Sequence, residues 1–258
     1  MALPASGPIP IGGSEFRSIN YEFGRSNTAT TSMSELYRGG SLVQSTNTNV
    51  PLSGAISLDN FHGAKLSGSV TYTSGSGNFT VPQGVTSITY SVVAGGGGGG
   101  AGYTASNVDY GYTYPAVGGG AGSGGRKLNQ TLAVTGGQVL AYSVGAGGPI
   151  NSGIGFGGWN GADGGNTTLG TDTVTGGQKG TYHNEGGGGG NQTNVTNQGA
   201  AGSPGGAAGS WSNNGPGGAG VVVNGVTYGT GGNGGRGLWT NPYGTAGTGG
   251  VVYITWGT

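Results

Sequence analysis

The chain has 258 residues, of which 68 are glycine and none is cysteine, and its eight basic residues balance eight acidic ones. Zero formal net charge leaves no electrostatic surface for nucleic acid or an anionic membrane, and the lack of cysteine excludes disulfides and thiolate metal sites. Neither a basic start nor an apolar stretch of signal-peptide length follows Met1, so we expect the chain to stay in the cytoplasm where it is made, unless it leaves inside an assembly.

Glycine makes up about a quarter of the chain, against about 7% in ordinary proteins. Glycine runs are either disordered or packed backbone against backbone. Only 6% of the residues are charged and 9% are aromatic, which favours packing because disordered segments usually keep themselves soluble with charge. Collagen is disfavoured because glycine does not recur at every third position in stretches such as 126–135.

Residues 1–66 predict short capped helices. The first is expected to start after Ser14 and to run for about three turns to Gly24. The second follows a capping box formed by Ser32 and Glu35. A similar sequence pattern recurs at 57–63 and suggests an internal repeat of a small docking element, with His62 at its carboxyl end.

The apolar residues of these helices suit either a small self-contained cap or a surface that docks on another subunit. A lone core is marginal at this length, so we favour docking. The polar run 45–53 would then be an extended arm that reaches a neighbouring chain. The docking candidates are Phe16, Phe23, Leu36, Tyr37, Leu58 and Phe61.

After Leu66 the apolar period changes from helical spacing to two, which predicts β-strands. We expect the first and last strands to pair, so that everything between them projects outwards. The strands are predicted around Val70 and Tyr72, Phe79 and Val81, and at 85–92, 132–134, 139–144, 221–223 and 251–256.

Glycine runs recur between these strands, near 95–102, 118–125, 145–148, 155–165, 186–190, 199–209, 215–220, 231–237 and 244–250. Polyproline II helices have three residues per turn and no internal hydrogen bonds, so their backbone groups must find partners on neighbours. Only glycine lets such backbones approach closely. The predicted fold class is therefore mainly β and irregular, with residues 67–258 forming a glycine-rich domain of strands and packed polyproline II helices of the polyglycine II kind.

Segments between the glycine runs are rich in tyrosine, tryptophan, serine and asparagine, and we expect them to be loops at the two ends of the glycine block. This composition is typical of binding loops. The alternative is that the aromatic side chains only cover the block's edges. Their neutrality favours an apolar or sugar-like target over a phosphate-rich one. The candidates are Tyr103, Tyr110, Tyr112, Tyr114, Trp159, Tyr182, Trp211, Trp239 and Tyr243.

Catalytic motifs are not found. The two histidines, His62 and His183, lack the spacing of a zinc site. No glycine run ends in the Gly-Lys-Ser or Gly-Lys-Thr of a phosphate-binding loop, and no serine stands in a Gly-x-Ser-x-Gly nucleophile elbow. The carboxylates of the second half make a glycosidase pair formally possible, but nothing singles out two of them, and Asp163 stands alone where calcium would need clustered oxygens. We expect a non-enzyme without cofactor or metal.

Several sequence segments resemble those of known protein families. The opening 3–9, the box 32–40 and the segment 53–64 resemble the N-terminal region of tail-associated virion proteins of tailed bacteriophages. The stretch from Gly77 to Gly95, closed by 249–256, looks like the glycine-rich domain of phage and bacterial surface proteins. The runs with variable loops are also similar in architecture to tail-fibre tip adhesins of some T-even-like phages, although the N-terminal half differs from that family.

The resemblance implies a virion protein of the tail, assembled in the host cytoplasm and anchored to other virion proteins through residues 1–66. It implies a homotrimer and a glycine-rich tip that binds a host surface polysaccharide or outer-membrane protein. The alternatives are a purely structural tail, baseplate or capsid-exterior component without host recognition, and a polysaccharide-cleaving enzyme.

Overall fold

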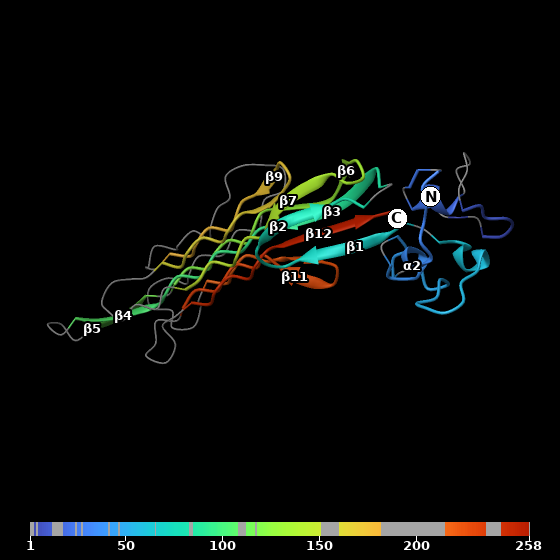
Figure 1. Cartoon of the computed structure of the whole chain (residues 1–258). Coiled ribbons are helices and arrows are strands. Elements are labelled where there is room, and N and C mark those ends of the chain that lie inside the picture. The colour runs from blue at the N-terminus through green and yellow to red at the C-terminus, as the bar shows by residue number, and fades with distance from the viewer. Residues whose placement is uncertain are drawn as a thin grey trace.

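The chain forms an elongated molecule (Figure 1). The structure is a computed structural model of the whole chain, and it describes residues 3, 5–11, 18–23, 25–26, 28–40, 42–45, 47–64, 66–82, 85–107, 112–116, 118–150, 160–181, 215–235 and 244–257. Short helices lie at one end, antiparallel sheets follow, and extended glycine-rich segments project from the sheets to the other end. The predicted mainly β and irregular fold class is confirmed.

Three short helices and twelve strands occur in the described residues. The helices are α1 (Ile19–Glu22), α2 (Met33–Leu36) and the 3-10 helix η1 (Leu58–Phe61). The strands are β1 (Gly68–Tyr72), β2 (Ser76–Thr80), β3 (Ser87–Val93), β4 (Tyr103–Asn107), β5 (Tyr112–Ala116), β6 (Arg126–Ala133), β7 (Val139–Ser143), β8 (Thr167–Leu169), β9 (Asp172–Val174), β10 (Val221–Val223), β11 (Val226–Tyr228) and β12 (Val251–Trp256).

Local caps explain where the helices begin. The capping box is confirmed at α2, where the Ser32 N–H donates to the Glu35 carboxylate at 2.8 Å. The three-turn helix from Ser14 is wrong, because Ser18 has an extended backbone with ψ 154° that a continuous helix cannot contain. Instead Ser18 caps the short α1, its hydroxyl accepting the N–H of Tyr21 at 3.2 Å.

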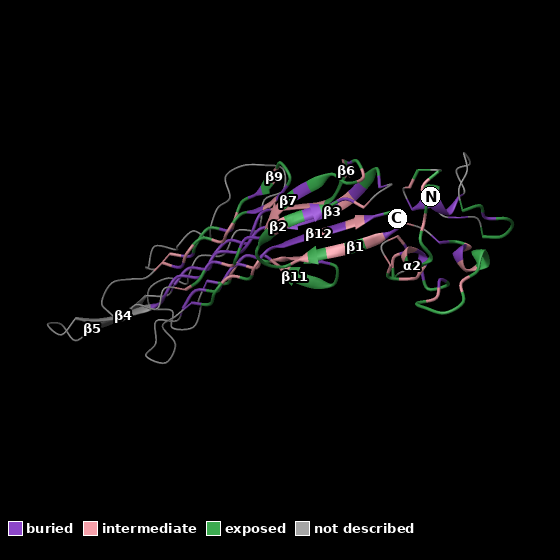
Figure 2. Cartoon of the chain, in the orientation of Figure 1, coloured by how far each residue is buried: buried purple, intermediate pink, exposed green. Residues whose placement is uncertain are grey.

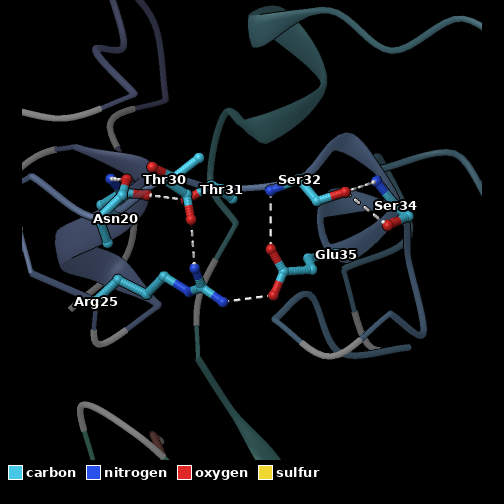
Figure 3. A network of polar contacts seen from close by, with 8 residues as sticks. Asn20, Arg25, Thr30, Thr31, Ser32, Ser34 and Glu35 are labelled. Atoms are coloured by element: carbon cyan, nitrogen blue, oxygen red, sulfur yellow. Dashed lines mark hydrogen bonds and ion pairs between the residues drawn. The ribbon is translucent and has the colours of Figure 1, made fainter.

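Polar contacts join α1 to α2 (Figure 3). Arg25 donates to the Thr30 carbonyl at 2.7 Å and forms an ion pair with Glu35, the same carboxylate that caps α2. Beside this pair, the Thr31 hydroxyl donates to the side-chain oxygen of Asn20 at 2.7 Å. One carboxylate therefore both starts a helix and fastens it to the preceding one.

The N-terminal region has an apolar core of its own. The segment 45–53 contributes to it and is not an extended arm: Val50 is fully buried, and its N–H donates to the Asn47 carbonyl in a tight turn. The apolar Val50 side chain makes folding back more favourable than exposure. The buried residues of this core are Leu3, Ile9, Ile19, Phe23, Leu36, Val43, Val50, Phe61 and Ala64.

Two four-stranded antiparallel sheets form a sandwich, with strand orders β1-β12-β3-β6 and β2-β7-β8-β9. The expected pairing of the first and last strands is confirmed, since Val70 of β1 lies opposite Ile254 of β12. Side chains of both sheets meet in one core, where the rings of Phe79 and Trp256 lie 5.6 Å apart. Leu66 packs against this core and against the N-terminal core.

Five strands were not predicted: β4 and β5 of one hairpin, the pair β8 and β9, and strand β11. Tight turns explain two of the pairings. Asn224 and Gly225 both have positive φ, 48° and 78°, as a two-residue hairpin turn between β10 and β11 requires. Gly170 has φ 58° between β8 and β9. The asparagine–glycine pair was visible in the sequence as a hairpin signal.

A partly buried polar bridge connects the two sheets of the sandwich. Asp172 of β9 accepts hydrogen bonds from the Tyr90 hydroxyl and, at 2.8 Å, from Lys127 of β6. Partial burial alone would raise the pKa of Asp172, but the hydrogen bonds from Lys127 and Tyr90 outweigh it and hold the pKa below its usual value. Burial and the adjacent carboxylate raise the pKa of Tyr90, which keeps its hydroxyl a donor.

Asp172→Asn should therefore make stability less dependent on acid pH. The folded pKa lies below the unfolded value of about 3.9, so the carboxylate stabilises the fold above that pH and the stabilisation is lost as pH falls through the folded pKa. We expect about 1 kcal/mol less unfolding free energy at pH 7, with the difference shrinking below about pH 4. Urea titrations from pH 7 to pH 3 test this, with the exposed Asp59→Asn as control. An equal difference at every pH would contradict the assignment.

Glycine-rich segments leave the sheets and form what we call the glycine array. Its segments run alternately away from the sheets and back toward them. Buried residues continue from β3 into segment 94–102 of the array (Figure 2). The segments are 94–102, 118–125, 144–150, 160–166, 175–181, 215–220, 229–235 and 244–250.

One segment of the array, residues 95–100, lies at its centre. Its N–H groups reach three neighbours in turn: Gly95 and Gly98 donate to segment 160–166, Gly96 and Gly99 to 244–250, and Gly97 and Gly100 to 118–125. Its carbonyls accept from three further segments, 175–181, 144–150 and 229–235. The central segment thus has six neighbours, and the hydrogen-bond direction repeats at every third residue.

Backbone contact in the array leaves no room for side chains at the centre. A Cβ atom added to Gly95 would lie 2.0 Å from the Ala146 carbonyl oxygen, and one added to Gly99 would lie 1.9 Å from that of Asn233. Contacts below about 3 Å are not found between real Cβ atoms and backbone oxygens. Glycine is therefore required at these positions by the closeness of the neighbouring chains.

Side-chain oxygens replace backbone carbonyls along the outer edges of the array. Asp163 accepts the N–H of Lys179 at 2.8 Å, and three residues on, Asn166 accepts that of Gly176 at 3.0 Å. Thr245 and Thr248, also three residues apart, accept the N–H groups of Asn233 and Thr230. These side chains satisfy backbone donors in place of a backbone carbonyl.

Candidate functional site

The described residues that flank the connections between outgoing and returning segments of the array lie at its end farthest from the sheets, which we call the outer end. The N–H of Gly118 donates to Gly235 at 2.9 Å, and the N–H of Gly119 donates to Thr181 at 2.9 Å. Gly235 in turn donates to Gly100 at 2.8 Å. The segments 103–117, 150–160, 182–214 and 236–243 therefore all begin and end at the same end of the array.

The helical region lies at the opposite end of the molecule. Strand β1 starts at Gly68, opposite Trp256, and ends at Tyr72, opposite Val252 next to the array. Residues 1–66 precede Gly68 and so lie beyond the far end of the sandwich (Figure 1). The outer end and the N-terminal region are thus separated by the length of the sandwich and of the array.

Every aromatic binding candidate belongs to one of the four connecting segments at the outer end. We expected loops at both ends of the glycine block. At the end next to the sheets, the described segments of the array are instead connected by strands and their turns. Tyr103, Tyr112 and Tyr114 lie in the hairpin β4–β5, which was predicted as loop. The other candidates lie outside the described residues: Tyr110, Trp159, Tyr182, Trp211, Trp239 and Tyr243.

Docking candidates of the N-terminal region are partly corrected. Phe23, Leu36 and Phe61 are only 1%, 3% and 1% exposed and form the region's own core, because segments 42–50 and 3–9 cover the helices. Leu58 is 43% exposed, and the half-buried Tyr37 donates its hydroxyl to the Gly54 carbonyl. Phe16 lies outside the described residues.

Other apolar side chains are exposed in this region, and sequence reasoning missed them. Tyr21 and Met33 lie beside buried residues on α1 and α2, so helical spacing alone did not separate the two sets, and Ile11 and Leu52 lie outside any helix or strand. Their exposed fractions are large for apolar residues. They are Ile11 (47%), Met33 (51%) and Leu52 (65%), together with Tyr21 (41%).

The carboxylate and histidine side chains named here could in principle act in catalysis or ligate a metal, but in the described part they make structural contacts. Asp163 accepts a backbone N–H and Asp172 bridges the sheets, while Asp109 and Glu185 lie outside the described residues. His62 ends η1, as predicted, 3.6 Å from Asp59. In the described ranges no cluster of three potential metal ligands occurs.

No helix in the ranges that the structure covers has the length and hydropathy needed to cross a bilayer.

The candidate site is the outer end of the array, defined by the four connecting segments, of which the first contains the hairpin β4–β5. No protein-family model matches this chain, and no curated protein matches it either.

Proposed function

We propose that this protein is a tail component of a bacteriophage virion that binds the host cell surface. In this proposal, residues 1–66 attach the chain to other virion proteins, and the outer end of the glycine array carries the receptor contacts. The role is binding and not catalysis, and it involves no nucleic acid and no membrane insertion. A homotrimer is the assembly that the family resemblance implies.

The placement of the aromatic segments is the observation that carries the proposal. All nine binding candidates belong to segments that begin and end at the outer end, and the N-terminal region lies at the opposite end of the molecule. An adhesive virion protein needs this polarity, because one end must hold the particle while the other meets the cell. Tyrosine and tryptophan give large contact area at low entropic cost.

The glycine array supports the proposal as a spacer. We infer that its segments are polyproline II helices, because the hydrogen-bond direction of residues 95–100 repeats at every third residue, which is the period of that helix. Six residues at a rise of about 3.1 Å span roughly 19 Å. Hydrogen bonds to six neighbours hold this spacer in one conformation, so the connecting segments are displayed from a rigid support.

Attachment through residues 1–66 is supported by the exposed apolar side chains of that region. Met33, Leu52 and Leu58 are between 43% and 65% exposed, whereas the aromatic candidates Phe23 and Phe61 are buried. Exposed apolar side chains are the usual anchors of protein interfaces when they lie together. They replace Phe23, Leu36 and Phe61 as the candidates for contact with a virion protein.

Binding of the full-length chain to host cells tests the proposal. Fluorescently labelled protein should bind cells of the strain on which the phage grows and should compete with phage adsorption. A variant with Trp159, Trp211, Trp239 and Tyr243 replaced by alanine should bind at least about tenfold more weakly, because truncating aromatic anchors typically removes 2 kcal/mol or more.

The matched control is Tyr21→Ala, which removes an exposed aromatic ring at the other end of the molecule. It should leave cell binding unchanged. Absence of binding by the parent protein would favour the purely structural alternative. Release of reducing ends from host polysaccharide would instead assign an enzyme.

A further inference from the structure

Asparagine–glycine pairs occur in very different surroundings in this structure. A backbone nitrogen that follows asparagine can attack the side-chain amide carbon of that asparagine, and glycine hinders the attack least because it has no Cβ. Each such pair can therefore deamidate, at a rate that the local structure sets. The described pairs are Asn160–Gly161, Asn224–Gly225 and Asn233–Gly234, and the asparagine of a fourth, Asn214, lies outside the described residues.

The array holds the attacking nitrogen of two of these pairs in hydrogen bonds. The N–H of Gly161 donates to the Gly180 carbonyl at 3.0 Å. The N–H of Gly234 donates to the Gly215 carbonyl at 2.8 Å. The side-chain oxygen of Asn233 also accepts a backbone N–H at 2.8 Å, so its amide is held as well. Reaction at either pair needs the array to open first, because moving the nitrogen toward the side-chain amide breaks these bonds.

The third pair forms the turn between β10 and β11. Asn224 and Gly225 are both exposed, and a Cβ added to Gly225 would meet no atom within 4 Å. In the described part of the chain, neither the Gly225 N–H nor the Asn224 side chain has a hydrogen-bond partner. A two-residue turn is closed by the residues on either side of it, here Val223 and Val226, which leaves its own N–H groups free. The nitrogen and the amide at this turn are thus held by no hydrogen bond.

The hairpin β10–β11 also opens more readily than the array. Its strands have three residues each and belong to neither four-stranded sheet. A two-stranded hairpin is at best marginally stable alone, so this one depends on Val223, which packs with Val93 and Val251 of the sandwich. Beside the turn, Val222 and Val226 are 63% and 51% exposed, so little apolar burial holds the tip closed.

We propose that Asn224 is a site of spontaneous deamidation in the folded protein. The Gly225 nitrogen loses its proton to solvent base and bonds to Cγ of Asn224, the bond from Cγ to Nδ2 breaks, and ammonia leaves. Water then adds to the resulting succinimide ring and opens it at either of its two carbonyls, which gives aspartate or isoaspartate. One water molecule is consumed and one ammonia is released, with no oxidant and no enzyme. This modification is independent of the proposed function.

Deamidation changes both the charge and the backbone of the turn. Either product adds one negative charge to a chain of zero formal net charge. Isoaspartate also lengthens the backbone by one carbon atom, so the turn no longer matches the register that pairs Val223 with Val226. We therefore expect isoaspartate to loosen the packing of the hairpin against β3 and β12.

Peptide mapping by mass spectrometry tests the proposal. Full-length protein is kept for several weeks in mildly alkaline buffer at physiological temperature, and a second sample is kept in the same way in concentrated urea. In the folded sample, the peptide with Asn224 should deamidate at least about tenfold faster than those with Asn160 and Asn233, because only the latter two need the array to open. In urea the three rates should become similar, because the hydrogen bonds that separate them are gone.

The matched variant is Asn224→Gly, which removes the amide but keeps a residue suited to the positive φ of this turn position. It should show no deamidation in this peptide and should retain the circular dichroism spectrum of the parent. Equal rates at the three asparagines of the folded protein would overturn the proposal. So would an unchanged Asn224 in the folded sample while the sample in urea converts.

Discussion

Replacing Gly97 with alanine should disrupt the glycine array. A Cβ at this position would lie 2.2 Å from the Gln178 carbonyl oxygen and 2.6 Å from its carbon. The clash is with backbone, which cannot rotate away as a side chain does. Gly97 also donates to Gly122 and accepts from Gly232, so relief by movement breaks hydrogen bonds on two further segments. We expect a loss of about 3 kcal/mol or more of unfolding free energy.

Gly249→Ala is the matched control within the same array. The nearest atoms to a Cβ there lie 3.8 and 3.9 Å away, which is ordinary van der Waals contact. Its effect should stay within about 1 kcal/mol. Thermal and urea unfolding followed by circular dichroism, together with the soluble yield, compare the two variants. Equal stability of both would mean that residues 95–100 are not enclosed by backbone.

Phe61→Ala should unfold the N-terminal region while the sandwich stays folded. Phe61 is 1% exposed at the end of η1, in a core built from fewer than 70 residues. Truncation of a buried phenylalanine removes about 3 to 5 kcal/mol, which exceeds what a core of this size can spare. Hydrogen exchange resolved by mass spectrometry should show lost protection in residues 1–64 and retained protection in β3 and β12.

The control for this variant lies three residues earlier in the same 3-10 helix. Leu58 is 43% exposed, so Leu58→Ala should change stability by less than about 1 kcal/mol. If Leu58→Ala weakens virion incorporation without unfolding the region, the side chain acts at the surface. Loss of protection throughout the chain in Phe61→Ala would show instead that the two cores do not unfold separately.

The longer strands of the sandwich were predictable because apolar alternation is a local property, whereas the three-residue strands β8 and β9 were missed. Val70 and Tyr72 alternate with polar residues, and 251–256 read as a buried strand, so even the pairing of β1 with β12 followed from the sequence. The capping box of α2 was equally local, since Ser32 and Glu35 stand three residues apart.

The segments that pack on the apolar faces of the short helices could not be predicted in the same way. Helical spacing places Phe23 and Leu36 on apolar faces but does not tell which segment covers them. The covering residues, Val43 and Val50, lie in polar stretches without any period. The region therefore looked too poor in apolar residues to bury its own helices.

Glycine content predicted that backbones would pack, but not where the packing stops. The edges are marked by Asp163 and Asn166, and by Thr245 and Thr248, each pair three residues apart. This spacing was present in the sequence and is the signal that reasoning from glycine alone overlooked.

The sequence suggests the candidate binding residues, which stay a prediction, but it does not give the geometry of the outer end. Tyr112 and Tyr114 alternate with other residues, as in a strand, but Pro115 and the flanking glycines favoured a loop. Placement of all four connecting segments at one end depends on hydrogen bonds between distant segments, such as Gly118 to Gly235, which no local pattern encodes.

The central position of residues 95–100 also sets the order in which the molecule is completed during synthesis. All six neighbouring segments follow it in the chain, the last being 244–250, and β12 then inserts between β1 and β3. Contacts of such long sequence separation form slowly. A nascent chain that ends before residue 244 lacks one of the six neighbours of segment 95–100, and it holds the strands β1 and β3 without the β12 that joins them. The array and this sheet can therefore be completed only after residues 244–256 have left the ribosome.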